Sequence, residues 1–427
     1  MRVVLFLSIA VAIQGLLSPA GFSEESLRLD EAIVEALAKN PELREARERW
    51  QAAKLRIPQA SALPDPTVGY MVMGPNMLET RTGPQDQVYE AEQMIPFPGK
   101  LWERRRMAGA EANAAEAKLK ATERDVILKV TEAHANLYAT DASIAAVEEV
   151  QYFLNSLEAI TQARYGAQGG SQRDVAKAQV EASETAQRLL MLRQQRDATA
   201  ALLNALLDRD PRQPIGQVAA PEIPSPSWTL EELVAIARDH RPELREASAM
   251  LKRDRHAKTL AAFEYVPDVS VGFQYTKIGN GMTTDPADGK DVWMVPLMIN
   301  VPIWQNRLLP GVLEAKRNVK ASQAKLEQEE NLTEYEVRDA YYRFTATRES
   351  AALYEHAVLP QAEVAFRSDQ AGYEAGRTDA LNLLDSERIY LNAKVMAVQA
   401  VAEAAKGFAA LERAVGTDLK ARGGTTQ

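Results

Sequence analysis

The chain has 427 residues, with 50 Lys and Arg against 59 Asp and Glu, a net charge of −9 and no cysteine. The lack of cysteine excludes disulfides, cysteine-ligated metal centres, cysteine catalysis and lipid attachment through an N-terminal cysteine. A net acidic chain also lacks the basic surface that nucleic-acid binding requires. With only 22 Gly, 21 Pro and 6% aromatic residues, the composition favours long helices.

The N-terminus has the composition of an export signal. Val3–Leu17 is an apolar run that is shorter than the roughly 20 residues a membrane-spanning helix needs. Small residues follow it, so we predict a cleaved signal peptide over residues 1–23, with cleavage after Ala20 or Ser23. Export of a cysteine-free chain fits the bacterial envelope.

The chain repeats one design twice. Asn40–Ala46 (NPELREA) recurs as Arg241–Ala247 (RPELREA), and the dipeptide Pro64-Asp65 recurs as Pro267-Asp268. The preserved order predicts an internal duplication. The predicted organisation is a first repeat over 24–210, a proline-rich linker over 211–227, a second repeat over 228–416 and a flexible C-terminal tail over 417–427.

Each repeat is predicted to contain two short strands with alternating side chains. The predicted strands are Thr67–Met73, Gln87–Phe97, Val269–Thr276 and Trp293–Val301. About ten residues with one apolar face is typical of a transmembrane β-strand. On the last strand we expect the lipid-facing residues to be Trp293, Val295, Leu297 and Ile299.

Long helices account for most of each repeat. A first helix is predicted to begin at Asp30 or Thr229 and to be interrupted before Pro41 or Pro242. The predicted long helices are Lys100–Arg164 and Val312–Phe366, the second kinked at Pro360, and the predicted returning helices are Gln172–Leu207 and Asp379–Val415. At 1.5 Å per residue, 65 residues form a helix about 100 Å long.

Four membrane strands cannot close a barrel, because the open edges would leave unpaired backbone groups in lipid. Three protomers would close a 12-stranded β-barrel, with their long hairpins forming a continuous α-barrel. The predicted fold class is therefore mainly α with a small β part, assembled as a trimer.

The sequence resembles the TolC-type outer membrane efflux proteins over the whole mature chain. The resemblance rests on the duplicated order of elements and on Arg164-Tyr165 with Asp174-Val175, Gly376-Arg377 and Leu383-Leu384-Asp385. Gln93–Lys100 resembles the branch that serves heavy-metal exporters of the resistance-nodulation-division class. The resemblance implies an outer-membrane homotrimer that extends into the periplasm and works with a periplasmic adaptor and an inner-membrane resistance-nodulation-division pump.

The resemblance also implies two functional sites at the far end of the hairpins. The expected adaptor-contacting tips are Tyr165, Gly169, Gly170, Ser171, Tyr373, Gly376, Arg377 and Thr378. The expected periplasmic aperture is formed by Asp385, Asn382, Asp174 and Lys177. Three Asp385 carboxylates near a threefold axis would favour cations. An ordinary solvated helix face remains the alternative for these residues.

No catalytic motif is evident, so we predict no enzyme activity, no cofactor and no bound metal. The four histidines, His134, His240, His256 and His356, are expected to be solvated helix residues. Met71, Met73 and Met77 carry thioethers that suit copper(I), but their place on a strand and loop favours a lumen- or lipid-facing role.

The predicted function is a passive exit duct of a tripartite efflux system, with heavy-metal cations as the expected cargo. Two alternatives remain open at this point. The first is the outer-membrane component of a type I protein secretion or drug efflux system. The second is a soluble periplasmic coiled-coil scaffold, which the apolar face of residues 293–301 disfavours.

Overall fold

A computed structural model describes residues 27–74, 79–80, 83–167, 171–224, 228–279, 284 and 286–420. The predicted signal peptide and most of the predicted tail lie outside these residues. Within the described ranges, no helix is both long and apolar enough to cross a membrane.

The two repeats share one order of elements, but the long helix of the second repeat is divided into α7, η1 and α8. The first consists of α1 (Leu29–Lys39), α2 (Pro41–Ala60), β1 (Thr67–Val72), β2 (Glu79–Thr80), β3 (Gly83–Ile95), α3 (Pro98–Gly166) and α4 (Gln172–Leu206). The second consists of α5 (Leu230–His240), α6 (Pro242–Phe263), β4 (Val269–Ile278), β5 (Val292–Met294), β6 (Leu297–Ile299), α7 (Gln305–Leu353), η1 (Tyr354–Val358), α8 (Leu359–Glu374) and α9 (Ala380–Val415).

Local capping explains where the short helices begin. The Asn40 side chain accepts hydrogen bonds from the backbone N–H groups of Glu42 and Leu43, which fixes the start of α2 behind Pro41. Thr229 and Glu232 form a reciprocal capping box at the start of α5. Helix α5 ends at His240 and α6 begins at Pro242, so the predicted interruptions before both prolines are confirmed.

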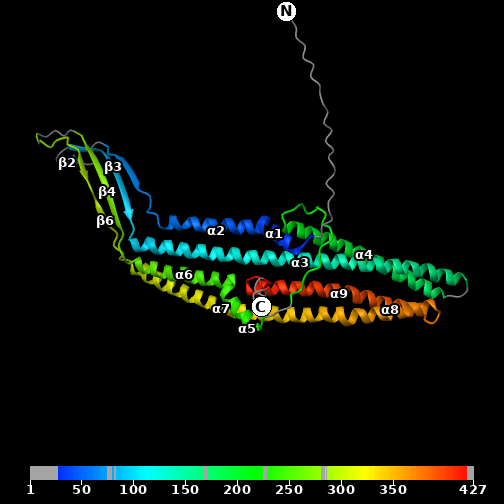
Figure 1. Ribbon diagram of the computed structural model, residues 1–427. Coiled ribbons are helices and arrows are strands. Elements are labelled where there is room, and N and C mark those ends of the chain that lie inside the picture. Colours follow the sequence, from blue (N-terminus) through cyan, green and yellow to red (C-terminus); the bar gives the residue numbers. More distant parts are fainter. Residues whose placement is uncertain are drawn as a thin grey trace, which may run out of the picture.

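The molecule is long and narrow (Figure 1). The strands lie together at one end, the α3–α4 and α8–α9 hairpins end at the opposite end, and α1 and α5 lie near the middle. Helix α3 alone has 69 residues and runs along most of this length. The predicted pair of long antiparallel hairpins is confirmed.

The sheet is antiparallel and joins the two repeats in the order β1-β3-β4-β5, with β6 also paired to β4. The prediction of one continuous strand over Trp293–Val301 was wrong, because the strand is split at Val295-Pro296. Proline has no N–H to donate to the ladder. The Pro296 carbonyl still accepts from the Gly272 N–H at 2.9 Å, so the register continues across the break.

The second long helix also differs from its prediction. It begins at Gln305, seven residues before the predicted Val312, and passes through Pro310. The expected kink at Pro360 takes the form of a π-helical segment, η1, directly before α8. Proline at 360 cannot donate to the preceding turn, so the hydrogen-bond ladder is rearranged there.

Buried apolar clusters lie along the helices. One joins α1, α3 and α4, a second joins α5, α7 and α9, and a third joins α3, α4, α8 and α9 toward the hairpin tips. Between them Ala135 and Ala139 of α3 pack against Ala402 and Ala405 of α9. Such small side chains let two helices approach closely over a long distance.

Candidate functional site: the hairpin tips and the groove between α4 and α9

The turn between α8 and α9 depends on glycine. Gly376 has φ of +70°, a left-handed conformation that side chains with a Cβ disfavour. The Gly372 carbonyl accepts from the N–H groups of Arg377 and Thr378 at 2.8 and 3.2 Å. This closes the turn and leaves Gly376 and Arg377 exposed at the tip.

The other tip lies between α3 and α4. Tyr165 is 48% exposed on the last turn of α3. Ser171 caps α4 by accepting a hydrogen bond from the N–H of Arg173 at 3.2 Å. The predicted tip residues Gly169 and Gly170 lie outside the described residues.

A cation–π contact joins the two tips. The guanidinium carbon of Arg164 lies 4.5 Å from the centroid of the Tyr373 ring. Tyr373 was expected at a partner-contacting surface, but only 7% of it is exposed, because it packs in the cluster that also contains Leu154 and Leu383. In this protomer its role is to support the tip from within.

Three of the four predicted aperture residues line one groove between α4 and α9. This groove has a volume of about 750 Å³ and is bordered by Lys177 on one side and by Asn382 and Asp385 on the other. Asp385 is ion-paired at 2.6 Å with Arg388, one turn further along α9, and both side chains are exposed. The structure thus places these residues together at the hairpin end of the molecule.

Asp174 lies in the first turn of α4 but is not among the residues that line the groove. It is 3.8 Å from the neighbouring Arg173, and its Oδ1 is buried without a hydrogen-bond partner among the described residues. Lys177 is the other predicted aperture residue on α4. For neither residue does the structure describe an ion pair that links the two hairpins within one chain.

The sequence reasoning missed a buried carboxyl beside the groove. Glu387 is only 1% exposed, and burial together with the nearby Glu181 raises its pKa to about 8. Its Oε1 has no hydrogen-bond partner among the described residues. The available signal was its spacing, because Glu387 follows Leu383 by four residues and precedes Leu391 by four, within one buried stripe.

The predicted lipid-facing residues form one exposed face of the sheet. Trp293, Val295, Leu297 and Ile299 are between 57% and 69% exposed. In the antiparallel register, Trp293 lies opposite Tyr275, and Leu297 lies opposite Val271. Directly opposed side chains share a face, so the apolar surface extends across the strands.

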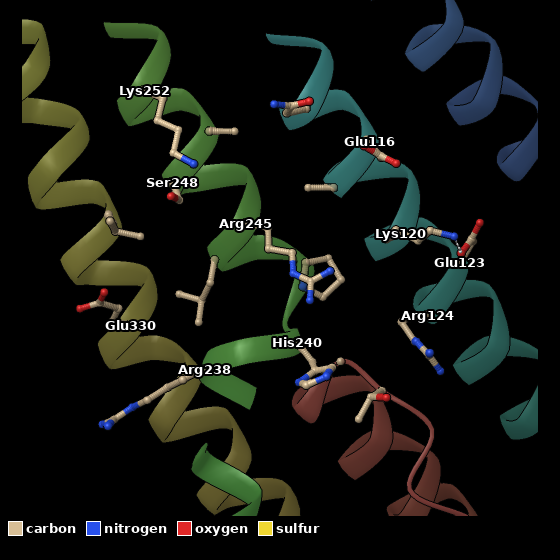
Figure 2. Close-up of a pocket in the computed structure, with 18 of the residues that line it drawn as sticks. Glu116, Lys120, Glu123, Arg124, Arg238, His240, Arg245, Ser248, Lys252 and Glu330 are labelled. Atoms are coloured by element: carbon tan, nitrogen blue, oxygen red, sulfur yellow. Dashed lines mark hydrogen bonds and ion pairs between the residues drawn. The ribbon is translucent and has the colours of Figure 1, made fainter. Parts of the chain in front are cut away.

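Another cavity lies beside α5 and α6 (Figure 2). It has a volume of about 1150 Å³, and its walls come mainly from α3, α5, α6 and α7. Arg245 and Lys252 on α6 face Glu116 and Lys120 on α3 across it. Cations and anions are mixed in this lining, so it offers no single charge that would select a ligand.

The expectation that all four histidines are solvated was wrong for His134. It is 1% exposed, and its Nε2 lies 3.0 Å from the Leu27 carbonyl oxygen. Burial lowers the pKa of His134, which favours the neutral form of the ring. His256 is also paired, with its Nδ1 2.7 Å from Glu103. Among the described residues, no group of three His, Asp or Glu side chains is arranged to hold a metal ion.

Comparison with known proteins identifies the class. The sequence profile of the outer membrane efflux protein family matches residues 32–209 and 233–417. The chain therefore belongs to the outer membrane efflux protein family, whose members are passive channels of the outer membrane that extend into the periplasm. This excludes the alternative of a soluble periplasmic scaffold.

Individual relatives are distant but cover nearly the whole chain. The chain is 24% identical over 406 residues to the cobalt-zinc-cadmium resistance protein CzcC of Cupriavidus metallidurans, covering 91% of this chain and 90% of that protein. The CmeC outer membrane channel of Campylobacter jejuni superposes with a TM-score of 0.78 at 16% identity, over 91% and 85% of the two chains. VceC of Vibrio cholerae gives 0.75 at 21% identity, over 91% and 96%. At these identities the two structures establish the fold alone.

Proposed function

We propose that three copies of this chain form an exit duct of a tripartite efflux system, which passively conducts heavy-metal cations out of the periplasm. The observation that supports this most directly is the sheet. In the part the structure describes, β1 is paired only with β3, and β5 and β6 are paired only with β4, so both edges are open.

An open edge is costly in a membrane. Each unpaired backbone group in lipid costs several kcal/mol, and an apolar face such as the one around Leu297 would not be stable in water. Three chains with four strand positions each would close a 12-stranded barrel and pair every edge. The long hairpins would then continue the barrel as a helical tube.

The far end of the tube is the proposed docking surface for the periplasmic adaptor, which in turn contacts an inner-membrane pump. Tyr165, Ser171, Gly376, Arg377 and Thr378 lie at or beside the two turns. The Arg164–Tyr373 contact holds these turns together. An exposed guanidinium and exposed backbone groups suit a polar, hydrogen-bonded interface.

The proposed cargo class rests on two observations. The relative CzcC is named for cobalt, zinc and cadmium resistance. In addition, Asp385 borders the groove at the end that would form the periplasmic aperture. A ring of three Asp385 carboxylates would concentrate cations there and repel anions.

Conductance measurements test the aperture. We expect the double variant Asp385→Ala/Asp174→Ala to raise the single-channel conductance of the trimer in planar bilayers severalfold. In the closed trimer these carboxylates would form exposed ion pairs with neighbouring protomers, which contribute about 0–1 kcal/mol each, so their removal in three copies weakens the closed state without unfolding it. Asp210→Ala, which removes an exposed carboxylate directly before the linker, is the matched control. Unchanged conductance in the double variant would refute the aperture assignment.

A further inference from the structure

The sheet carries a set of methionines on one face. Met71 lies in β1, Met94 near the end of β3, Met294 in β5 and Met298 in β6. Met94 and Met298 are both directly opposite Ser270. Along the other strands, the register and the two-residue period place Met71 and Met294 on this same face, which we name the thioether face.

The opposite face of the sheet is the apolar one. In the antiparallel register its apolar residues include Val68, Tyr70, Val72, Tyr89, Val271, Phe273, Tyr275, Trp293, Leu297 and Ile299. None of the four methionines lies there. Val88 and Val292 also lie on the thioether face, but the methionines of the described strands lie on that face alone, a segregation that apolar packing does not require.

The thioether face also carries carboxylates. Glu90 is opposite Gln274, which in turn is opposite Met294, and Glu92 lies two residues further along β3. A Cβ on Gly69 would lie 2.4 Å from Glu90 Oε1, so glycine at this position leaves room for the Glu90 side chain across the face. Met94, Glu92 and Glu90 are successive residues of β3 on this face, and each lies about 6.8 Å along the strand from the next, since they are two residues apart.

Barrel closure would also bring methionines of neighbouring protomers close to one another. This step rests on the proposed function. Met71 lies on one edge strand and Met294 and Met298 lie on the other, so the edge-to-edge pairing of neighbouring protomers brings their strands together. Since the apolar face meets lipid, the thioether face lines the lumen. Three copies would then surround the conducting path.

We propose that this lumenal face is a transit site for soft monovalent metal cations, a class that includes Cu(I) and Ag(I). Thioether sulfur is a soft ligand that binds such cations in preference to hard or borderline ones. The neighbouring Glu90 and Glu92 carboxylates attract positive charge without selecting among cations. Neutral sulfur ligands on flexible side chains bind weakly, and conduction requires a site that releases the ion.

The test uses the full-length trimer, with silver nitrate in chloride-free buffer as the probe. We expect calorimetry to show Ag⁺ binding by the wild-type protein. In bilayers, we expect Ag⁺ added on the side of the loops that join the strands, opposite the helical tube, to reduce the K⁺ current. The variant Met71→Leu/Met94→Leu/Met294→Leu/Met298→Leu keeps side-chain volume nearly constant. We expect it to bind Ag⁺ at least about tenfold more weakly, with an unchanged K⁺ current in the absence of silver.

Two further variants complete the design. Met191→Leu/Met396→Leu removes exposed methionines of α4 and α9 and is expected to leave Ag⁺ binding unchanged. If the quadruple variant does not assemble, Met294→Leu/Met298→Leu should lose part of the Ag⁺ binding.

Equal Ag⁺ binding by the wild type and the thioether-face variants would overturn the inference. Equally tight Zn²⁺ binding that depends on the same methionines would also overturn it. A wild-type trimer that conducts but binds no silver overturns it alone, whereas a protein that forms no conducting trimer overturns the proposed function as well.

Discussion

Glu387 is a carboxyl group buried in the middle of a long helix, where a charged residue would be expected to face solvent. It lies in α9 against α4, and the charged groups that act on it are Glu181 and Arg188 of α4 and Arg388 of α9. Burial is the largest cause of its raised pKa, and the Glu181 carboxylate adds to the effect. At neutral pH the folded protein therefore holds Glu387 largely as the neutral acid.

This predicts a pH-dependent stability. Because the pKa of Glu387 rises from 4.5 to about 8 on folding, its favourable contribution is complete below about pH 4.5 and is lost as the pH rises toward 8. Glu387→Gln cannot ionise, so we expect the thermal unfolding midpoint of this variant to fall less between about pH 5 and pH 9. Above pH 8 the variant should be the more stable protein, by a few kcal/mol at most.

The measurement is thermal unfolding of the purified protein in detergent across this pH range. Glu403→Gln is a suitable control, since Glu403 lies on the same helix and 58% of its side chain is exposed. Parallel pH profiles for wild type and Glu387→Gln would show that Glu387 does not titrate as the structure indicates.

Single residues also show the limit of sequence analysis. Asp385 and Asn382 were found because of their position in a family pattern, and the structure places both on the same groove. Glu387 and His134 were missed, because a charged or titratable residue in a long helix gives no sign of which neighbours will cover it. Their burial depends on α4 and on the Leu27 segment, which are distant in the sequence.

At the scale of elements, the two glycines of the second tip have different roles. A Cβ at Gly376 would meet no atom within 4 Å, whereas a Cβ at Gly372 would lie 2.4 Å from Thr378 Oγ1. We therefore expect Gly376→Trp to leave the trimer intact, at a conformational cost of about 1 kcal/mol, while its side chain blocks the docking surface. Gly372→Val should instead distort the turn itself.

The comparison needs cells that express the partner adaptor and pump. Gly376→Trp should abolish metal resistance while trimers remain detectable on non-denaturing gels. Gly376→Asn, which tolerates the left-handed conformation, should retain most of the resistance. Loss of trimers in Gly376→Trp would make this glycine a folding residue and not a docking residue.

Elements were predictable where local chemistry alone decides them. The Asn40-Pro41 and Arg241-Pro242 interruptions and the glycine turn at 376 were all visible in the sequence. The split of the last strand at Pro296 and the π-helical segment before Pro360 were not. In both cases proline removes a hydrogen bond, but the way the neighbouring backbone adapts depends on what packs against it.

At the scale of the whole molecule, successive side chains of the last strand point to opposite faces of the sheet. Leu297 and Met298 are neighbours in β6, yet the register places Leu297 with Val271 on the apolar face and Met298 with Ser270 on the opposite face. If three chains close a barrel, the first side chain meets lipid and the second meets the aqueous lumen. Neighbouring residues of similar size should therefore differ sharply in their tolerance of charge.

We predict that Leu297→Arg prevents stable insertion, whereas Met298→Arg is tolerated. A lipid-facing Arg costs from about 0–1 kcal/mol near the membrane interfaces to about 2–4 kcal/mol at the bilayer midplane, and the threefold assembly would carry three of them. An Arg in the lumen remains hydrated and changes ion selectivity more than stability. The readouts are the amount of protein in the outer-membrane fraction and the temperature at which the trimer dissociates on gels. An equal loss of outer-membrane protein in both variants would contradict the assignment of the two faces. Only a boundary between lipid and lumen along this strand makes the free-energy cost of Arg differ between positions 297 and 298.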